Sequence, residues 1–151
     1  MSLSKLMTAL GAAAVVAAAT PVLAQPVAAA RLNPNTATAA QLAALPQLNP
    51  GLAASIQRAR PFKTTADFNT LVRQTLSAEQ AQALYPQLFV PISLNTATRE
   101  EIALIPGMTP RMIREFLEYR PYTSIEQFNR EIGKYVDQTE LARLRSYVAL
   151  N

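Results

Sequence analysis

The chain of 151 residues contains neither cysteine nor histidine. Without cysteine it has no disulfides, so its fold depends on side-chain packing and on hydrogen bonds at the helix ends. Without histidine it lacks the most common general base and the most common metal ligand, as well as any Cys–His or Ser–His catalytic couple. Both absences favour a protein that binds over a protein that catalyses.

Beyond the N-terminal region, the sequence has no hydrophobic run long enough to cross a membrane. Residues 1–24 have the pattern of a secretory signal peptide, since Lys5 precedes the apolar run Leu6–Ala19 and small residues mark a cleavage site before Gln25. The apolar run is shorter than the ~20 residues of a membrane-spanning helix, so we expect cleavage and export instead of an anchor. A second cleavage site follows Ala30, which leaves the mature N-terminus open.

Charge is distributed unevenly, but the excess of positive charge is small. Residues 31–90 carry five basic and two acidic side chains, whereas residues 91–151 carry eight of each. A basic balance favours nucleic acid or an anionic surface as the partner. An excess of this size does not show whether the partner is of this kind.

A repeat with an offset of 60 residues organises the rest of the chain, and the sequence NTAT marks the start of both copies. Both copies place helix-start signals, either a capping box or a capping residue before proline, at four matching positions. These pairs are Thr38 and Thr98, Asn49 and Thr109, Thr64 and Ser124, and Ser77 and Asp137. The sequence therefore predicts two copies, at residues 32–90 and 94–151, joined by residues 91–93 and preceded by a flexible leader at residues 25–31.

Apolar residues within each copy recur at steps of three, four and seven, which is the period of an α-helix. Examples are Leu52 and Ile56 in the first copy and Ile113, Phe116 and Leu117 in the second. An Arg–Pro pair is expected to end the second helix of each copy, because the residue before proline is pushed out of the helical region. No alternating run is long enough for a strand. We therefore predict an all-α fold with about four short helices per copy.

The first two helices of each copy flank a short turn, which reads IPGMTP at Ile105–Pro110 in the second copy. Together with the NTAT phrase and the aromatic residue after each Arg–Pro pair, this turn resembles helix-hairpin-helix proteins of two families. One is the PsbU family, extrinsic lumenal subunits of photosystem II, and the other is the ComEA family, exported competence proteins that bind DNA. The resemblance covers nearly all of residues 32–151, once per copy. It implies tandem helix-hairpin-helix repeats and leaves two functions open, because one fold serves both.

The hairpin residues bear on the choice between these functions. DNA-binding members of the resembled families have a second glycine after the hydrophobic residue, so that backbone N–H groups approach a phosphate. Here Thr109 and Asn49 stand at that position, and Gln47 replaces the first glycine, which the second copy keeps as Gly107. A capping Thr or Asn satisfies some of these N–H groups from within, so the hairpins favour protein docking.

Several side chains are candidates for contact with a partner. Arg111 and Arg114 begin the second helix of the second copy, and each is expected to pair with a glutamate four residues further on. Tyrosine is favoured at protein interfaces, although the same rings can close a small core. Arg143 is expected to complement the dipole of the last helix. The hairpin candidates are Asn49, Gly51, Gly107, Met108, Thr109, Arg111 and Arg114, and the partner-facing candidates are Arg58, Arg60, Lys63, Tyr119, Tyr122 and Tyr135.

We expect an exported, non-catalytic docking protein that stabilises a protein complex at the periplasmic or thylakoid-lumenal face of a membrane, as PsbU does. It would be soluble or peripherally attached, with no cofactor and no small-molecule substrate. The alternative is an exported, ComEA-like protein that binds the DNA backbone without sequence preference. An enzyme is not expected, because the carboxylates lie at solvent-facing helical positions, away from any nucleophile or metal ligand.

Overall fold

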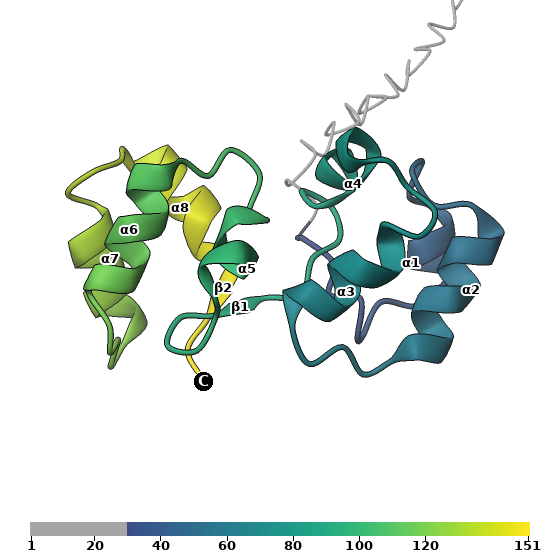
Figure 1. Cartoon of the computed structure of the whole chain (residues 1–151), viewed down its shortest axis with the longest axis horizontal. Coiled ribbons are helices and arrows are strands. Elements are labelled where there is room, and N and C mark those ends of the chain that lie inside the picture. The colour runs from purple at the N-terminus through teal and green to yellow at the C-terminus, as the bar shows by residue number, and fades with distance from the viewer. Residues whose placement is uncertain (1–29) are drawn as a thin grey trace, which may run out of the picture.

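The computed structural model describes residues 30–151, and the expected signal peptide at residues 1–24 lies outside the described residues. The described chain is mostly helical (Figure 1), which confirms the all-α prediction with four helices in each copy. No helix in this part of the chain has the length and apolar character needed to cross a membrane. The elements are α1 (Ala39–Ala43), α2 (Pro50–Ala59), α3 (Thr65–Val72), α4 (Ala78–Leu84), β1 (Ile92–Ser93), α5 (Arg99–Ala103), α6 (Pro110–Glu118), α7 (Ile125–Ile132), α8 (Gln138–Arg145) and β2 (Val148–Ala149).

Each of these helices begins at the capping residue that the sequence predicted. Thr38, Ser77 and Thr98 close full capping boxes, in which the cap and the third helical residue exchange hydrogen bonds. Asn49 and Thr109 cap helices that start with proline. A cap provides acceptors for N–H groups that have no partner in the first turn of a helix. Because a cap involves residues within one turn, the local sequence determines where each helix begins.

The two strands are a feature that the sequence pattern did not predict. β1 and β2 pair in parallel, with Ile92 opposite Val148, so the entry and exit of the second copy run side by side. The first copy has the same pairing as a single bridge between Leu32 and Leu88. Strands of two residues are too short to produce a visible alternation of apolar and polar side chains. Ile92 and Ser93 of the predicted joint therefore form β1, which pairs with the end of the second copy.

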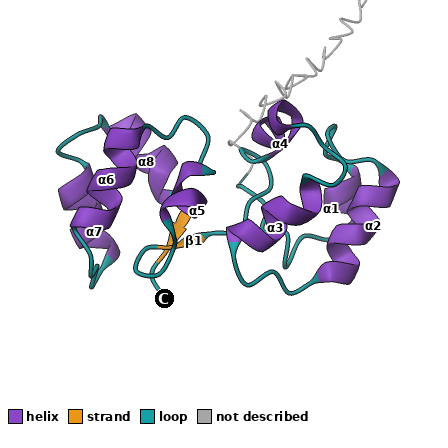
Figure 2. Cartoon of the chain, viewed as in Figure 1, coloured by secondary structure: helices purple, strands orange, loops and turns teal. Residues whose placement is uncertain are grey.

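The two copies contact each other through α3 and α5 (Figure 2). A chain of aromatic rings also joins them. Phe89, at the end of the first copy, packs edge-to-face on Tyr147 of the second, with ring centroids 5.0 Å apart, and on Tyr85 at 5.4 Å. All three rings are at most 1% exposed. Arg31 stacks on Tyr147, 3.2 Å from the ring centroid, and donates to the Ser146 carbonyl. These contacts bury aromatic surface between the copies and hold them at a defined orientation.

One asparagine holds the turn after the second helix of each copy. The side chain of Asn35 accepts from the N–H of Phe62 at 2.7 Å and donates to the Phe62 carbonyl at 2.9 Å. Asn95 makes the same two bonds with Tyr122. The Arg–Pro bonds that precede these aromatic residues are both cis, and α2 and α6 end at or just before them, as predicted. The turn therefore directs Phe62 and Tyr122 into the core.

Candidate nucleic-acid interface

The hairpin of the second copy lies between α5 and α6 and exposes Gly107. Gly107 has a φ of 76°, a left-handed conformation that favours glycine. Met108 is half-buried, and its N–H donates to the carbonyl of Ile105 at 3.1 Å. The exposed Thr109 accepts the N–H of Met112 at 3.2 Å. The cap is confirmed, and the glycine before it leaves backbone accessible at the tip of the hairpin.

Arg111 and Arg114 on α6 are exposed, and the glutamate pairs expected for them do not form. The ion pairs of residues 30–151 lie instead on or beside α7 and α8. Glu115 is 7% exposed, and Arg111 stacks on the ring of Tyr135, 5.3 Å from its centroid. The hydrogen bond with Tyr119, desolvation and the nearby Glu115 carboxylate all raise the pKa of Tyr135. The pairing prediction is wrong for both arginines: Glu115 is buried and does not pair with Arg111, and the exposed Glu118 does not pair with Arg114.

A third arginine reaches the hairpin from α8. Arg143 donates to the carbonyl of Pro106 at 2.7 Å, and its Nη2 lies 3.5 Å from the position of a Cβ built on Gly107. The same guanidinium makes hydrogen bonds of 2.6 and 2.7 Å to the Glu140 carboxylate, which raise the pKa of Arg143 and lower that of Glu140. Arg143 therefore supports the hairpin, a role that sequence reasoning missed. No local pattern indicates this role, because the contact joins residues 37 positions apart.

The hairpin of the first copy has neither the glycine nor the arginines. Gln47 is half-buried, and its side-chain oxygen accepts a hydrogen bond from Gln87 at 3.3 Å. Asn49 accepts the N–H of Leu52 at 2.8 Å, as a capping residue does. Gly51 lies in the first turn of α2 and offers no side chain to a ligand. This hairpin is therefore uncharged and its polar side chains are bonded within the copy.

The tyrosine candidates of the second copy fall into two groups. Tyr119 and Tyr135 are half-buried with their hydroxyls 2.8 Å apart, and the ammonium of Lys134 lies 5.3 Å from the Tyr119 ring centroid. Tyr122 is 2% exposed and packs against Phe128 at a centroid distance of 5.7 Å. Burial also raises the pKa of Tyr122. The prediction that Tyr122 faces a partner is wrong, because the turn after α6 places its ring in the core.

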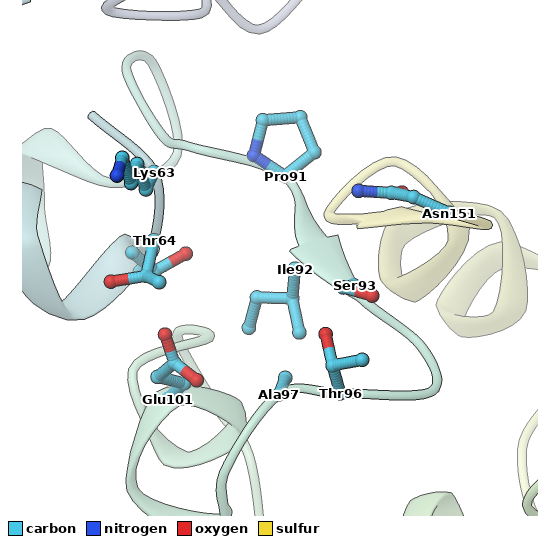
Figure 3. A pocket seen from close by; sticks show the side chains of 10 residues that line it. Lys63, Thr64, Pro91, Ile92, Ser93, Thr96, Ala97, Glu101 and Asn151 are labelled. Atoms are coloured by element: carbon cyan, nitrogen blue, oxygen red, sulfur yellow. The ribbon is translucent and has the colours of Figure 1, made fainter. Parts of the chain in front are cut away.

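The basic candidates of the first copy also fall into two groups, one bonded within the copy and one exposed. Arg60 donates to the carbonyl of Ala37 and so holds the chain that enters α1, which makes its partner-facing prediction wrong. Arg58 is exposed and donates to the Ser55 hydroxyl at 3.3 Å. Lys63 is exposed and lines a polar cavity of about 140 Å³ between the two copies (Figure 3). Only Arg58 and Lys63 of this set offer charge to a partner.

The cavity in Figure 3 lies between the two copies. Lys63 and Thr64 of the first copy line it together with Thr96 and Glu101 of the second. The Glu101 carboxylate accepts the N–H of Thr98 at 2.8 Å, so it serves as part of a helix cap. Among residues 30–151 there is no group of three or more side chains suited to hold a metal ion. The hairpin of the second copy therefore remains the better candidate for a functional surface.

Residues 27–82 match the family model for the helix-hairpin-helix motif. The match spans α1, α2, α3 and most of α4, which form the first copy, and the second copy repeats these elements 60 residues further on. No curated protein and no solved structure matches the chain. The chain is therefore an all-α protein that contains a helix-hairpin-helix motif.

Proposed function

We propose that the protein is an exported, non-catalytic binding protein that holds the phosphate backbone of DNA through the hairpin of its second copy. The proposal rests on exposed Gly107 beside Arg111 and Arg114, neither of which has a carboxylate partner in the described part of the chain. An exposed glycine lets a phosphate oxygen approach backbone N–H groups, and the start of α6 favours negative charge. DNA binding is thus preferred over protein docking, the reverse of the sequence-based expectation. The reason is that the two ion pairs predicted between these arginines and glutamates do not form.

The proposed contact recognises phosphates and not bases. Backbone N–H groups and arginines at a helix start bind phosphate oxygens, which carry no sequence information. Binding should therefore be independent of sequence and should weaken steeply as salt rises. Because the hairpin of the first copy is uncharged, we expect one such contact per chain. This is the ComEA-like alternative of the sequence-based interpretation.

Fluorescence anisotropy with a labelled DNA duplex, titrated from low to physiological salt, tests this function. We expect Arg111→Ala/Arg114→Ala to weaken binding and to reduce the slope of log K against log salt by about 2, since each phosphate contact contributes about 0.9. The matched control is Arg58→Ala/Lys63→Ala, which removes two charges from the first copy and should change the slope less. No binding at low salt, or equal losses in both double variants, would refute the proposal.

Docking on a protein complex at the periplasmic or lumenal face of a membrane, in the manner of PsbU, is the second candidate. The hairpin of the first copy favours it, because Gln47 and Asn49 are bonded within the copy and present no charge to a phosphate. Both functions place the protein outside the cytoplasm after removal of residues 1–24. If DNA does not bind at low salt, a pull-down from membrane fractions becomes the measurement that supports docking.

A further inference from the structure

A groove on the first copy lies beside Ala59, at a position where the second copy has a tyrosine. The groove lies between the end of α2 and α3 and has a volume of about 400 Å³. Its apolar lining includes Ala59, Phe62 and Leu71, and its polar lining includes Lys63 and Gln74. Because the two copies repeat with one offset, the second copy indicates which kind of side chain fits this place.

In the second copy, Tyr119 stands at the position of Ala59. The hydroxyl of Tyr119 lies 2.8 Å from that of Tyr135, and the Lys134 ammonium lies 5.3 Å from its ring centroid. The first copy has uncharged, non-aromatic residues at the positions of both Tyr135 and Lys134. An alanine in place of a tyrosine leaves the space of a phenol ring open to solvent. The groove of the first copy thus lacks the phenol ring that Tyr119 supplies at the matching position of the second copy.

We propose that this groove docks an aromatic side chain from a partner polypeptide, in the place that Tyr119 takes in the second copy. The charged residues beside the groove indicate which kind of residue lies next to that aromatic side chain in the partner. Lys63 is exposed and has no ion-pair partner within residues 30–151, whereas Asp67 already accepts the N–H of Thr64 as part of a helix cap. The partner segment therefore carries a tyrosine or phenylalanine next to an acidic residue, which pairs with the Lys63 ammonium.

This inference goes beyond DNA binding and uses the other copy of the repeat. The proposed phosphate contact lies at the hairpin of the second copy, whereas the groove is formed by α2 and α3 of the first. A single ring in an open groove binds weakly, so it contributes selectivity within a larger contact. Loss of one function leaves the other unchanged, and the two experiments are separate.

Nuclear magnetic resonance of the purified protein, titrated with p-cresol as the side chain of tyrosine, tests the groove. We expect saturable shifts at Ala59, Leu71 and Gln74, with little response to isoamyl alcohol as a non-aromatic control. Ala59→Tyr supplies the missing ring and should abolish the shifts at the other two residues. The matched control is Ala43→Tyr on the exposed face of α1, which should leave them intact.

The reverse substitution opens the site in the other copy. Tyr119→Ala should create a second set of p-cresol shifts at Glu131 and Lys134, the counterparts of Leu71 and Gln74. Absence of saturable shifts in the wild type, or their persistence in Ala59→Tyr, would overturn the proposal. If Tyr119→Ala does not fold, the comparison of the wild type with Ala59→Tyr decides alone.

Two blocked tripeptides, Glu-Tyr-Glu and Lys-Tyr-Lys, test the acidic neighbour. We expect the acidic peptide to bind the groove several-fold more tightly than the basic one, because Lys63 has no internal ion-pair partner. Lys63→Ala should remove this preference, so that the two peptides bind with equal affinity. Equal affinities for the two peptides in the wild type would contradict the proposed acidic residue in the partner.

Discussion

At the scale of single residues, a difference between the copies determines whether a buried amide has a partner. The Tyr85 hydroxyl donates to Oδ1 of Asn69, whereas the second copy has Arg145 at the matching position and Oδ1 of Asn129 is buried without a partner in the described chain. Tyr85 is 1% exposed, and burial raises its pKa from 10.0 to about 12. The folded protein therefore keeps this phenol protonated at pH values where an unfolded chain ionises it.

We predict that this tyrosine makes the protein less stable as pH rises from about 10 to about 12. In that window the unfolded state has lost the proton that the folded state keeps, so rising pH favours unfolding, by about 3 kcal/mol for two pKa units. Tyr85→Phe should flatten this part of the curve. Near neutral pH the same substitution should lower the free energy of unfolding by about 1 to 3 kcal/mol, because the side chain of Asn69 loses its hydrogen-bond donor. Urea unfolding at several pH values measures both effects, and an unchanged alkaline slope would assign the pH dependence to other groups.

At the scale of elements, the hairpin of the second copy depends on its glycine. Gly107→Ala should destabilise the protein by about 1 to 2 kcal/mol, because a residue with a Cβ is strained in the left-handed region. The new Cβ would lie 3.5 Å from Arg143 Nη2, an ordinary contact, so the cost comes from the backbone. Thermal unfolding measures the change.

Gly51→Ala is the control for this prediction, since Gly51 lies in the first turn of α2 and has no positive φ. Alanine has the higher helix propensity, by up to about 1 kcal/mol, and the contact of 3.3 Å from its Cβ to Asn49 Oδ1 reduces this gain. We expect little change or a small stabilisation. If both variants lost the same stability, the left-handed conformation of Gly107 would not be the cause.

The sequence predicts those elements that depend on neighbouring residues. All the helix starts were correct, because a cap such as Thr98 and its partner three residues on lie within one turn. The inward positions of Arg60 and Glu115 have no such local signal, whereas a core position for Tyr122 was one of the two interpretations that the sequence left open. Each depends on a contact across the fold, such as the bond from Arg60 to a carbonyl 23 residues earlier. The absence of ion pairs at Arg111 and Arg114, which supports DNA binding, has no local signal in the sequence.

At the scale of the whole molecule, the two copies are coupled through aromatic side chains. Phe89 joins the rings of the first copy to Tyr147 of the second, and it is 1% exposed. Replacing a buried phenylalanine with alanine costs about 3 to 5 kcal/mol. We predict that Phe89→Ala both lowers stability and uncouples the copies, so that their backbone amides no longer exchange hydrogen with a common free energy of opening.

The double-mutant comparison with Phe128→Ala separates coupling from simple destabilisation. Phe128 is fully buried and packs on Phe116 and Tyr122, so it acts within the second copy. With Phe89 present, Phe128→Ala should lower the exchange protection of both copies, because opening of one exposes the rings of the other. In the Phe89→Ala background it should affect the second copy alone. If Phe128→Ala affected only the second copy even with Phe89 intact, the copies would fold independently and the aromatic contact would orient them without coupling their stability.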